Sequence, residues 1–326
     1  MNRTTGTATC LVVGSLAGWL ACCGHNGPGP LQFPLERTEA RLARGKYLVT
    51  SVTHCFYCHS DIDWSSPEAP PKPGKMGGGA VDPEEGLPGR VVPSNISPDK
   101  ETGAGTWADE DFYRAMTQGI GKDGRTLFPL MPYMHFREMS DEDLASIIVY
   151  VRSIEPVRNV LPKTELVEAV KQSLKPLPPK PFSPPPDLSD PVKRGAYLAN
   201  AATCIECHTP PTPSGELQPG MEFSGGYVLK GPWGEPASAN LTPDPSGIPY
   251  YDEATFIESI RTGKVKARKL NILMPWRYFR NMTDQDLKAV FAYLRTLKPV
   301  AHRVDNTEKP TPCKRCGFVH GLGSAN

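Results

Sequence analysis

Residues 53–61 read THCFYCHSD and residues 202–210 read ATCIECHTP, so one chain carries the pattern C-x-x-C-H twice. The residues concerned are Cys55, Cys58, His59, Cys204, Cys207 and His208. Two cysteines three residues apart lie on one side of a helical turn, and a histidine directly after them can turn its imidazole onto the face of a flat ligand. Zinc binding, a redox disulfide and covalent haem attachment all begin with C-x-x-C.

The histidine after the second cysteine separates these three chemistries. A structural zinc site needs four ligands, and neither stretch is followed by a second pair at zinc-binding spacing. A thioredoxin-like redox pair belongs in a βαβ setting, which the flanking sequence does not show. We therefore predict two c-type haems, each held by two thioether bonds and ligated by His59 or His208.

The surroundings of the two stretches repeat as well. Four segments return in the same order 143 to 150 residues later: RGKYL at Arg44 and RGAYL at Arg194, NISPD at Asn95 and NLTPD at Asn240, MPY at Met131 and MPW at Met274, and MSDEDL at Met139 and MTDQDL at Met282. We therefore predict duplicated domains at residues 37–160 and 191–302. The linker at 161–190 ends in a proline-rich part that should be extended and semi-rigid.

Each domain reads as a small helical unit with long loops. Apolar spacing, capping residues and glycine stops predict three helices per domain, at 39–52, 109–118 and 140–153 in the first and at 191–202, 252–262 and 283–294 in the second. No convincing alternating strand pattern is present. The predicted fold class is therefore all-α.

A six-coordinate haem also needs a second axial ligand. Met131 and Met274 share an LMP context between the middle and last helices, so we predict that their thioether sulfurs bind the iron. Met139 and Met282 match between the domains too and compete for this role. Because each lies just before a helix N-cap, both fit better as hydrophobic staples.

Two further candidates occur only in the first domain. Met134 and His135 align with Arg277 and Tyr278 in the second domain. At these two positions the second domain has no residue that could serve as the same iron ligand. If both haems are ligated in the same way, Met134 and His135 are therefore excluded.

Charge and composition narrow the function. The chain has 326 residues with 36 basic and 35 acidic side chains, so it has no basic excess to gather a polyanion, and nucleic acid is not an expected partner. Its 36 prolines, 30 glycines and hydrophobic fraction of 39% predict much loop and a thin aliphatic core. Two large apolar macrocycles tethered by cysteines would complete that core.

The N-terminus is typical of an export signal. Arg3 precedes an apolar run from Cys10 to Ala21 that is too short to span a bilayer comfortably. The run ends in WLACC, which resembles a bacterial lipoprotein signal with lipid on Cys22 or Cys23; plain cleavage and an uncleaved anchor are the alternatives. We expect a signal or lipoprotein-like segment at residues 1–23 and a periplasmic protein that a lipid or anchor could hold at the membrane.

The C-terminal tail at residues 303–326 contains another C-x-x-C pair. Gly317 stands where a haem-ligating histidine would be, so a third haem is not expected. Cys313, Cys316 and His320 are too few ligands for a closed zinc site. Outside the cytoplasm, we expect a disulfide between Cys313 and Cys316.

From these motifs, residues 37 to 302 resemble the bacterial diheme cytochromes c, with two class I cytochrome c domains in tandem, of the kind that accompany periplasmic dehydrogenases. The resemblance implies that Asn95, Trp107, Arg125 and Asn240 line the propionate side of the haems. Turn formation by the asparagines is the alternative. The second domain departs from the pattern, since Tyr250 or Tyr251 replaces the tryptophan and GKVKARKLNILMPW replaces GIGKDGRTLFPLMPY.

The resemblance also implies that Gly45 and Gly195 let the first helix of each domain cross the last one closely, near Tyr150 and Tyr293. The alternative is that these glycines only weaken the helix beside the haem loop.

The expected function is transfer of single electrons by a carrier without substrate chemistry of its own. The resemblance implies a dehydrogenase as electron donor and another cytochrome or a terminal oxidase as acceptor. A diheme peroxidase is the enzymatic alternative, but paired Met-Pro segments argue against an open coordination position. A docking module whose haems exchange electrons with no partner is the third possibility.

Overall fold

The computed structural model describes residues 31–66, 69–81, 87–231, 233–266, 268–307, 309–314, 317 and 319–320. The predicted export segment with Cys22 and Cys23 lies outside these residues, as does Cys316, so the predicted lipidation and disulfide are not described. No helix in the described ranges is both long enough and apolar enough to cross a membrane.

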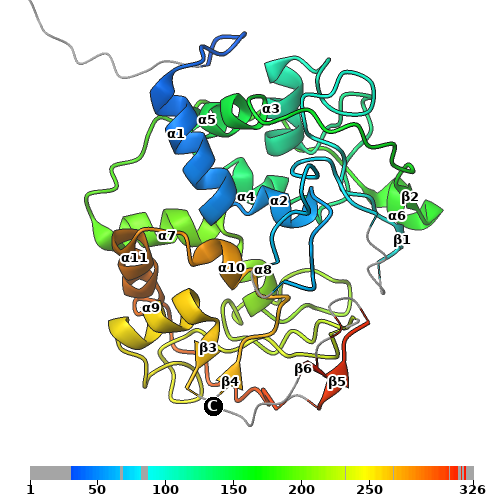
Figure 1. Cartoon of the computed structure of the whole chain (residues 1–326). Helices are drawn as coiled ribbons and strands as arrows, with labels where there is room; N and C mark the ends of the chain where they lie inside the picture. The colour runs from blue at the N-terminus through cyan, green and yellow to red at the C-terminus, as the bar shows by residue number, and fades with distance from the viewer. Residues whose placement is uncertain are drawn as a thin grey trace, which may run out of the picture.

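The two halves of the chain, residues 37–160 and 191–302, fold through the same order of helices (Figure 1). The first half contains α1 Glu39–Tyr47, the π-helical turn η1 Leu48–Val52, α2 Cys55–Cys58, α3 Asp109–Gln118, α4 Tyr133–Phe136 and α5 Asp141–Val151. The second half contains α7 Pro191–Ala201, α8 Cys204–His208, α9 Glu253–Thr262, α10 Trp276–Phe279 and α11 Asp284–Leu294. The predicted helices are present, and the structure is mostly helical.

The strands in the described part of the chain are only two residues long. Three antiparallel pairs form: β1 Gly89–Arg90 with β2 Glu165–Leu166, β3 Lys264–Val265 with β4 Arg268–Lys269, and β5 Thr311–Pro312 with β6 Val319–His320. Such short pairs fasten loops to one another and build no layer of their own.

Local sequence sets the ends of the helices. Ser140 and Thr283 accept hydrogen bonds from the backbone N–H of Asp143 and Asp286 at 3.2 and 3.1 Å, which caps α5 and α11 as predicted. Gly119 ends α3 and Gly263 ends α9, with φ of 68° and 67°. Glycine enters this left-handed region at little cost, so both middle helices stop where the sequence predicted.

The first and last helices of each half cross at a glycine. A Cβ on Gly45 would collide with the carbonyl of Ser146 and lie 2.7 Å from Cβ of Tyr150. A Cβ on Gly195 would likewise lie 2.8 Å from Cβ of Tyr293. The close crossings α1 with α5 and α7 with α11 are therefore confirmed, and they hold the helices that flank each cysteine motif.

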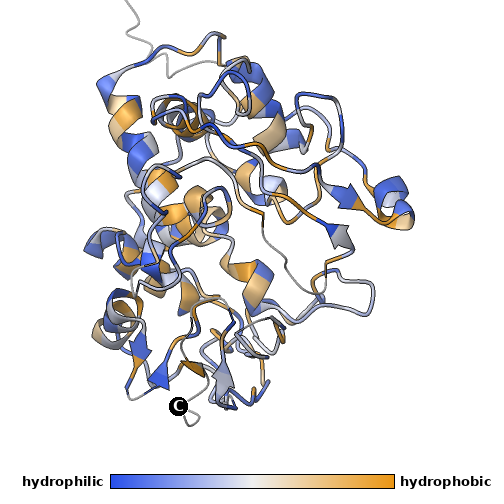
Figure 2. Ribbon diagram, turned by 45° about the vertical axis from the view of Figure 1, so that its right-hand side comes forward, coloured by the Kyte–Doolittle hydropathy of each residue, from blue (hydrophilic) through white to orange (hydrophobic). Residues whose placement is uncertain are grey.

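One apolar cluster runs through both halves. It includes Leu48, Phe136 and Leu144 of the first half together with Leu198 and Leu287 of the second. Figure 2 shows hydrophobic and hydrophilic residues mixed along the helices, as expected where each helix buries one face. The halves therefore share a core.

The proline-rich linker is docked on the first half. Its backbone runs beside α3 and α5, where Leu177 N–H donates to the carbonyl of Gln118 at 2.9 Å. Lys180 lies 2.5 Å from Asp141, and the two side chains are 2% and 5% exposed. The helix α6 Glu168–Ser173 and strand β2 interrupt its extended course. The linker is thus extended over part of its length and is held against the first half by these contacts.

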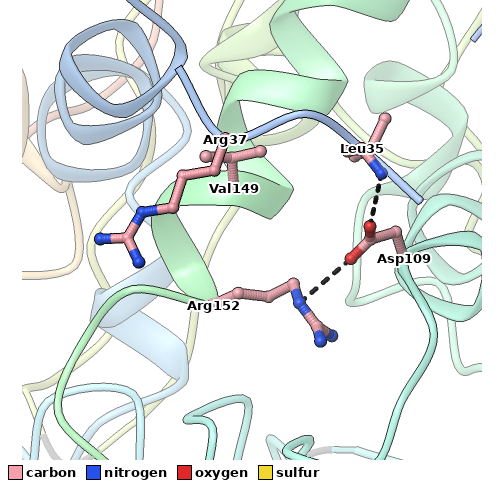
Figure 3. A pocket seen from close by; sticks show the side chains of 5 residues that line it. All are labelled: Leu35, Arg37, Asp109, Val149 and Arg152. Carbon is pink, nitrogen blue, oxygen red and sulfur yellow. Dashed lines mark hydrogen bonds and ion pairs between the residues drawn. The ribbon is translucent and has the colours of Figure 1, made fainter. Parts of the chain in front are cut away.

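The segment before α1 is also fixed to the first half (Figure 3). The carboxylate of Asp109 accepts a hydrogen bond from Leu35 N–H at 2.7 Å and pairs with Arg152 at 3.0 Å. Arg37 and Val149 complete the small pocket at this junction. The Asp109 side chain, at the start of α3, therefore joins three parts of the first half.

Candidate haem-attachment sites

Each cysteine pair lies on a single helical turn that starts from a strained residue. His54 before Cys55 and Thr203 before Cys204 have φ of 41° and 57°. A non-glycine residue rarely adopts positive φ, and a β-branched threonine does so at greater cost. The same deviation at both motifs turns the chain sharply from the preceding helix into α2 or α8, which places both thiols of a motif on one turn.

The two motif histidines are supported in the same way. Nδ1 of His59 lies 2.7 Å from the carbonyl oxygen of Ser94, and Nδ1 of His208 lies 2.7 Å from that of Ala239. A ring nitrogen beside a carbonyl must carry the proton and donate it, so Nε2 of each ring keeps its lone pair. Burial lowers the pKa of both imidazoles and favours the neutral form, which is the form that binds iron.

The loops that supply these carbonyls are fastened to the motifs by backbone bonds. Gly79 N–H donates to the carbonyl of His59 at 2.9 Å, and Gly225 N–H donates to that of His208 at 2.8 Å. Sequence reasoning missed Ser94 and Ala239. The signal was their position directly before the repeated NISPD and NLTPD segments.

The predicted propionate-side asparagines are both buried in their loops. Oδ1 of Asn95 accepts from the N–H and hydroxyl of Ser97, and its Nδ2 donates to the carbonyl of Val157 at 2.7 Å. Asn240 repeats this arrangement with Thr242 and with the carbonyl of Val300. Loop formation accounts for these bonds, and contact with a haem remains a prediction.

Trp107 and Arg125 interact with other residues than these asparagines do. The ring of Trp107 packs against Phe112 at 5.2 Å, on the edge of the apolar cluster. Arg125 is exposed and pairs with Asp123 at 3.0 Å. In the second half Tyr251 packs against the cluster, whereas Tyr250 is exposed.

The structure separates the two kinds of methionine. Met139 and Met282 are 0% and 3% exposed and belong to the interior of the cluster. Met131 and Met274 are only partly buried and pack against the cluster from outside. In both halves the residue two positions later donates its N–H to the methionine carbonyl at 2.8 Å, so the two Met-Pro turns have the same form. Iron ligation by Met131 and Met274 stays a prediction.

The chemistry of the donors fits a covalently held haem. Burial raises the pKa of the Cys55 thiol and raises that of Cys204 to about 12, which suits neutral thiols destined for uncharged thioether bonds. No group of three or more cysteine, histidine or acidic side chains in the described ranges is arranged to hold a metal ion. Trp276 Nε1 and the Tyr278 hydroxyl are buried without a hydrogen-bond partner among the described residues.

The two halves contact each other through matching tyrosine–aspartate hydrogen bonds. Tyr47 of α1 donates to Asp286 of α11, and the matching Tyr197 of α7 donates to Asp143 of α5 at 2.7 Å. Figure 1 shows α4 and α10 near the middle of the molecule, where the halves meet. The contacts are reciprocal, so the interface has approximate two-fold symmetry.

Comparison with known proteins agrees with this geometry. Residues 192–298 match the family model described as Cytochrome c, so the second half is a cytochrome c domain. The chain is 31% identical over 227 residues to a nicotinate dehydrogenase chain of Pseudomonas putida, covering 67% of this chain and 18% of that protein. It is 27% identical over 283 residues to "Alcohol dehydrogenase (quinone), cytochrome c subunit" of Gluconobacter oxydans, covering 81% and 56%.

A third relative is shorter. The chain is 26% identical over 219 residues to "Diheme cytochrome c-type" of Cereibacter sphaeroides, covering 65% of this chain and 73% of that protein. The chain thus spans less than two thirds of the first two relatives and most of the third.

Proposed function

We propose that this chain is a diheme c-type cytochrome that carries single electrons from a dehydrogenase to a cytochrome or oxidase. The observation that carries the proposal is the duplicated histidine support. Two C-x-x-C-H turns, in both halves of one chain, each present an imidazole whose Nδ1 is held by a backbone carbonyl and whose Nε2 is available.

In this proposal Cys55 and Cys58 hold the first haem and Cys204 and Cys207 hold the second. Haem iron supplies a one-electron redox couple. The protein supplies covalent tethers, a neutral imidazole and a thioether sulfur from Met131 or Met274. A thioether ligand favours reduced iron and raises the potential relative to a second histidine.

The architecture suits electron transfer because the ligands are preformed. The histidines are fixed by backbone bonds at 2.7 Å and the methionine turns have matched hydrogen bonds, so the coordination would change little between oxidation states. Neither half requires a substrate pocket for this task.

The relatives support the choice of partner. The alcohol dehydrogenase relative and the "Fructose dehydrogenase cytochrome subunit" of Gluconobacter japonicus are named as cytochrome subunits of dehydrogenases. By analogy, the donor of this chain is a dehydrogenase. We place the protein in the periplasm, because the N-terminal segment is typical of export. A lipid on Cys22 or Cys23, plain cleavage and an uncleaved anchor are the alternatives for its N-terminus.

Mass spectrometry and a redox titration test the proposal. The exported protein from a host with cytochrome maturation genes should exceed the mass of its chain and any lipid by two haems, and both should titrate as one-electron couples. A protein without added mass would refute haem attachment. Steady-state turnover of peroxide by the reduced protein would instead favour a diheme peroxidase.

A further inference from the structure

The same position in each half reaches across to the other half's cysteine motif. His135 of α4 and Tyr278 of α10 align in the repeat. His135 Nε2 lies 2.5 Å from the carboxylate of Glu206, between Cys204 and Cys207, and its Nδ1 lies 2.9 Å from the side-chain oxygen of Asn200. Each ring nitrogen of His135 therefore has a partner in the second half.

Tyr278 makes the reciprocal approach to the first half. Its ring lies 6.0 Å from the ring of Tyr57, which stands between Cys55 and Cys58, and 6.5 Å from His54. Only 9% of Tyr278 is exposed. The side chain therefore ends against the first cysteine motif, although it belongs to the second half.

The difference between the two positions lies in their polar partners. His135 is fully hydrogen-bonded, whereas the Tyr278 hydroxyl is buried with no hydrogen-bond partner among the described residues. A buried hydroxyl left unsatisfied costs about 1–3 kcal/mol, and folded proteins seldom leave one. The partner of this hydroxyl is therefore a group that the described residues do not supply.

The protonation state of the Tyr278 hydroxyl determines which kind of partner it needs. Burial, together with the nearby thiols of Cys58 and Cys55, raises the pKa of Tyr278 well above the ordinary value. The hydroxyl thus stays protonated at neutral pH and acts as a hydrogen-bond donor. It lies near the two cysteines that would carry the first haem, but no sulfur accepts its hydrogen bond.

We propose that Tyr278 belongs to the haem site of the other half: its hydroxyl donates a hydrogen bond to a propionate carboxylate of the haem held by Cys55 and Cys58. This inference rests on the proposed haem attachment. Reduced haem carries one more electron than oxidised haem, so a donor dipole at its edge stabilises the reduced form and raises the potential. The second half thereby tunes the first half's haem.

The test is a spectroelectrochemical titration of the full-length holoprotein with Tyr278→Phe, which keeps the ring and removes the hydroxyl. We expect the reduction equilibrium of the first haem to shift about twofold to tenfold toward the oxidised form, the range of one hydrogen bond. Tenfold corresponds to about 59 mV for one electron. The second haem should keep its potential.

The matched control is Tyr113→Phe, which removes a hydroxyl bonded to Asp141 at 3.1 Å in the first half itself. It should leave both potentials unchanged. Met131→Ala marks the first haem, because that haem alone should lose its methionine-to-iron spectrum. In the reduced wild-type protein, a slowly exchanging Tyr278 hydroxyl proton with a haem ring-current shift in the NMR spectrum would support the same contact independently.

Three results would overturn the inference. These are unchanged potentials in a folded Tyr278→Phe protein with two haems, a shift confined to the second haem, and a Tyr278 hydroxyl proton that exchanges as in a free tyrosine. Absence of haem from the wild-type protein is a different result, detected by mass, and refutes the proposed function instead.

Discussion

The two halves build the same histidine support but surround their Met-Pro turns with different charge. Residues 261–280 contain seven basic and no acidic side chains, whereas the matching residues 118–137 contain three basic and one acidic. In the first half, Arg125 pairs with Asp123 at 3.0 Å and Lys122 donates to the carbonyl of Thr106 at 2.5 Å. In the second half the hairpin β3–β4 exposes Lys264 and further lysines.

This difference shows which parts of the duplicated unit are fixed by packing. The close glycine crossings and the tyrosine contacts to Asp143 and Asp286 occur in both halves, because the shared core depends on them. The methionine loop faces outward and has diverged. The halves should therefore respond alike to loss of the cysteines, the axial methionines and the crossing glycines. They should differ at Lys180 and His135, whose contacts have no counterpart from the second half among the described residues.

The largest effect is expected from loss of a cysteine pair. Replacing Cys204 and Cys207 by serine removes both thioether tethers of the second haem, and replacing Cys55 and Cys58 does the same for the first. Each double variant should lose the mass of one haem and half of the haem absorbance. Cys313→Ser, a buried cysteine outside the motifs, should retain two haems. A double variant that keeps two haems would contradict the assignment.

Loss of one axial methionine should change a spectrum without releasing the haem. Met131→Ala and Met274→Ala should each abolish the methionine-to-iron band of one haem and lower its potential, because the sulfur stabilises reduced iron. Met134→Ala, on a side chain that is 45% exposed, serves as the control and should change neither haem. An unchanged spectrum in either variant would reassign that ligand.

The buried ion pair of the linker belongs to the first half alone among the described residues. Lys180→Ala leaves Asp141 buried without its cation and should lower the free energy of unfolding by about 3–5 kcal/mol. Urea denaturation measures the change. Lys230→Ala breaks an exposed pair with Glu235 and should cost less than about 1 kcal/mol. If the two variants lower the free energy of unfolding equally, the buried ion pair of the linker contributes little to stability.

The helix crossings should be equally sensitive in both halves. Gly45→Ala and Gly195→Ala each push a methyl group against the backbone of the partner helix, which should cost about 1–3 kcal/mol in urea denaturation. Lys46→Ala, on the exposed face of α1, should stay within about 0.5 kcal/mol. A cost at only one glycine would show that the crossings are not equivalent.

The smallest effect concerns pH. Burial alone would lower the pKa of His135, but the hydrogen bonds that its ring donates to Glu206 and Asn200 and the charges of Glu206 and Glu138 raise it above 6.5 overall. A raised pKa in the folded state adds stability that is complete below about pH 6.5 and is lost as pH rises through the folded value.

Urea denaturation at pH 5.5 and pH 8 measures this effect. We expect the wild type to gain stability relative to His135→Gln by less than about 1 kcal/mol on going from pH 8 to pH 5.5, because Glu206 is partly exposed. Burial lowers the pKa of His54 to about 4, and this group destabilises both proteins equally at the lower pH, so it cancels in the comparison. The aligned Tyr278 does not titrate in this range. The same pH dependence in His135→Gln would assign the effect to another group.

The helices could be predicted from the sequence because they depend on local signals. The glycine crossings join helices that are distant in the chain and were implied by the resemblance. Helical spacing, the N-caps Ser140 and Thr283 and the stops Gly119 and Gly263 act over a few residues. The π-helical turn and the two-residue strands gave no comparable signal. The fixed linker depends on one distant pair, Lys180 with Asp141, which no local pattern indicates.

At the candidate haem sites, prediction from the sequence was limited to residues whose side chains have a distinctive chemistry. Cysteine, histidine and methionine can be found from their chemistry, but Ser94 and Ala239 act through backbone carbonyls that every residue possesses. His135 and Tyr278 were set aside because they do not match as iron ligands. Their mismatch is informative at the interface, where each faces the other half.

The single apolar cluster has an evolutionary consequence. Duplication of a helical unit ordinarily yields two modules that can be lost, swapped or fused elsewhere. Here Phe279 of one repeat packs against His54 of the other, 5.4 Å between rings, so either copy alone would present a bare apolar face to water. The repeats have become obligate partners, inherited and folded as one piece.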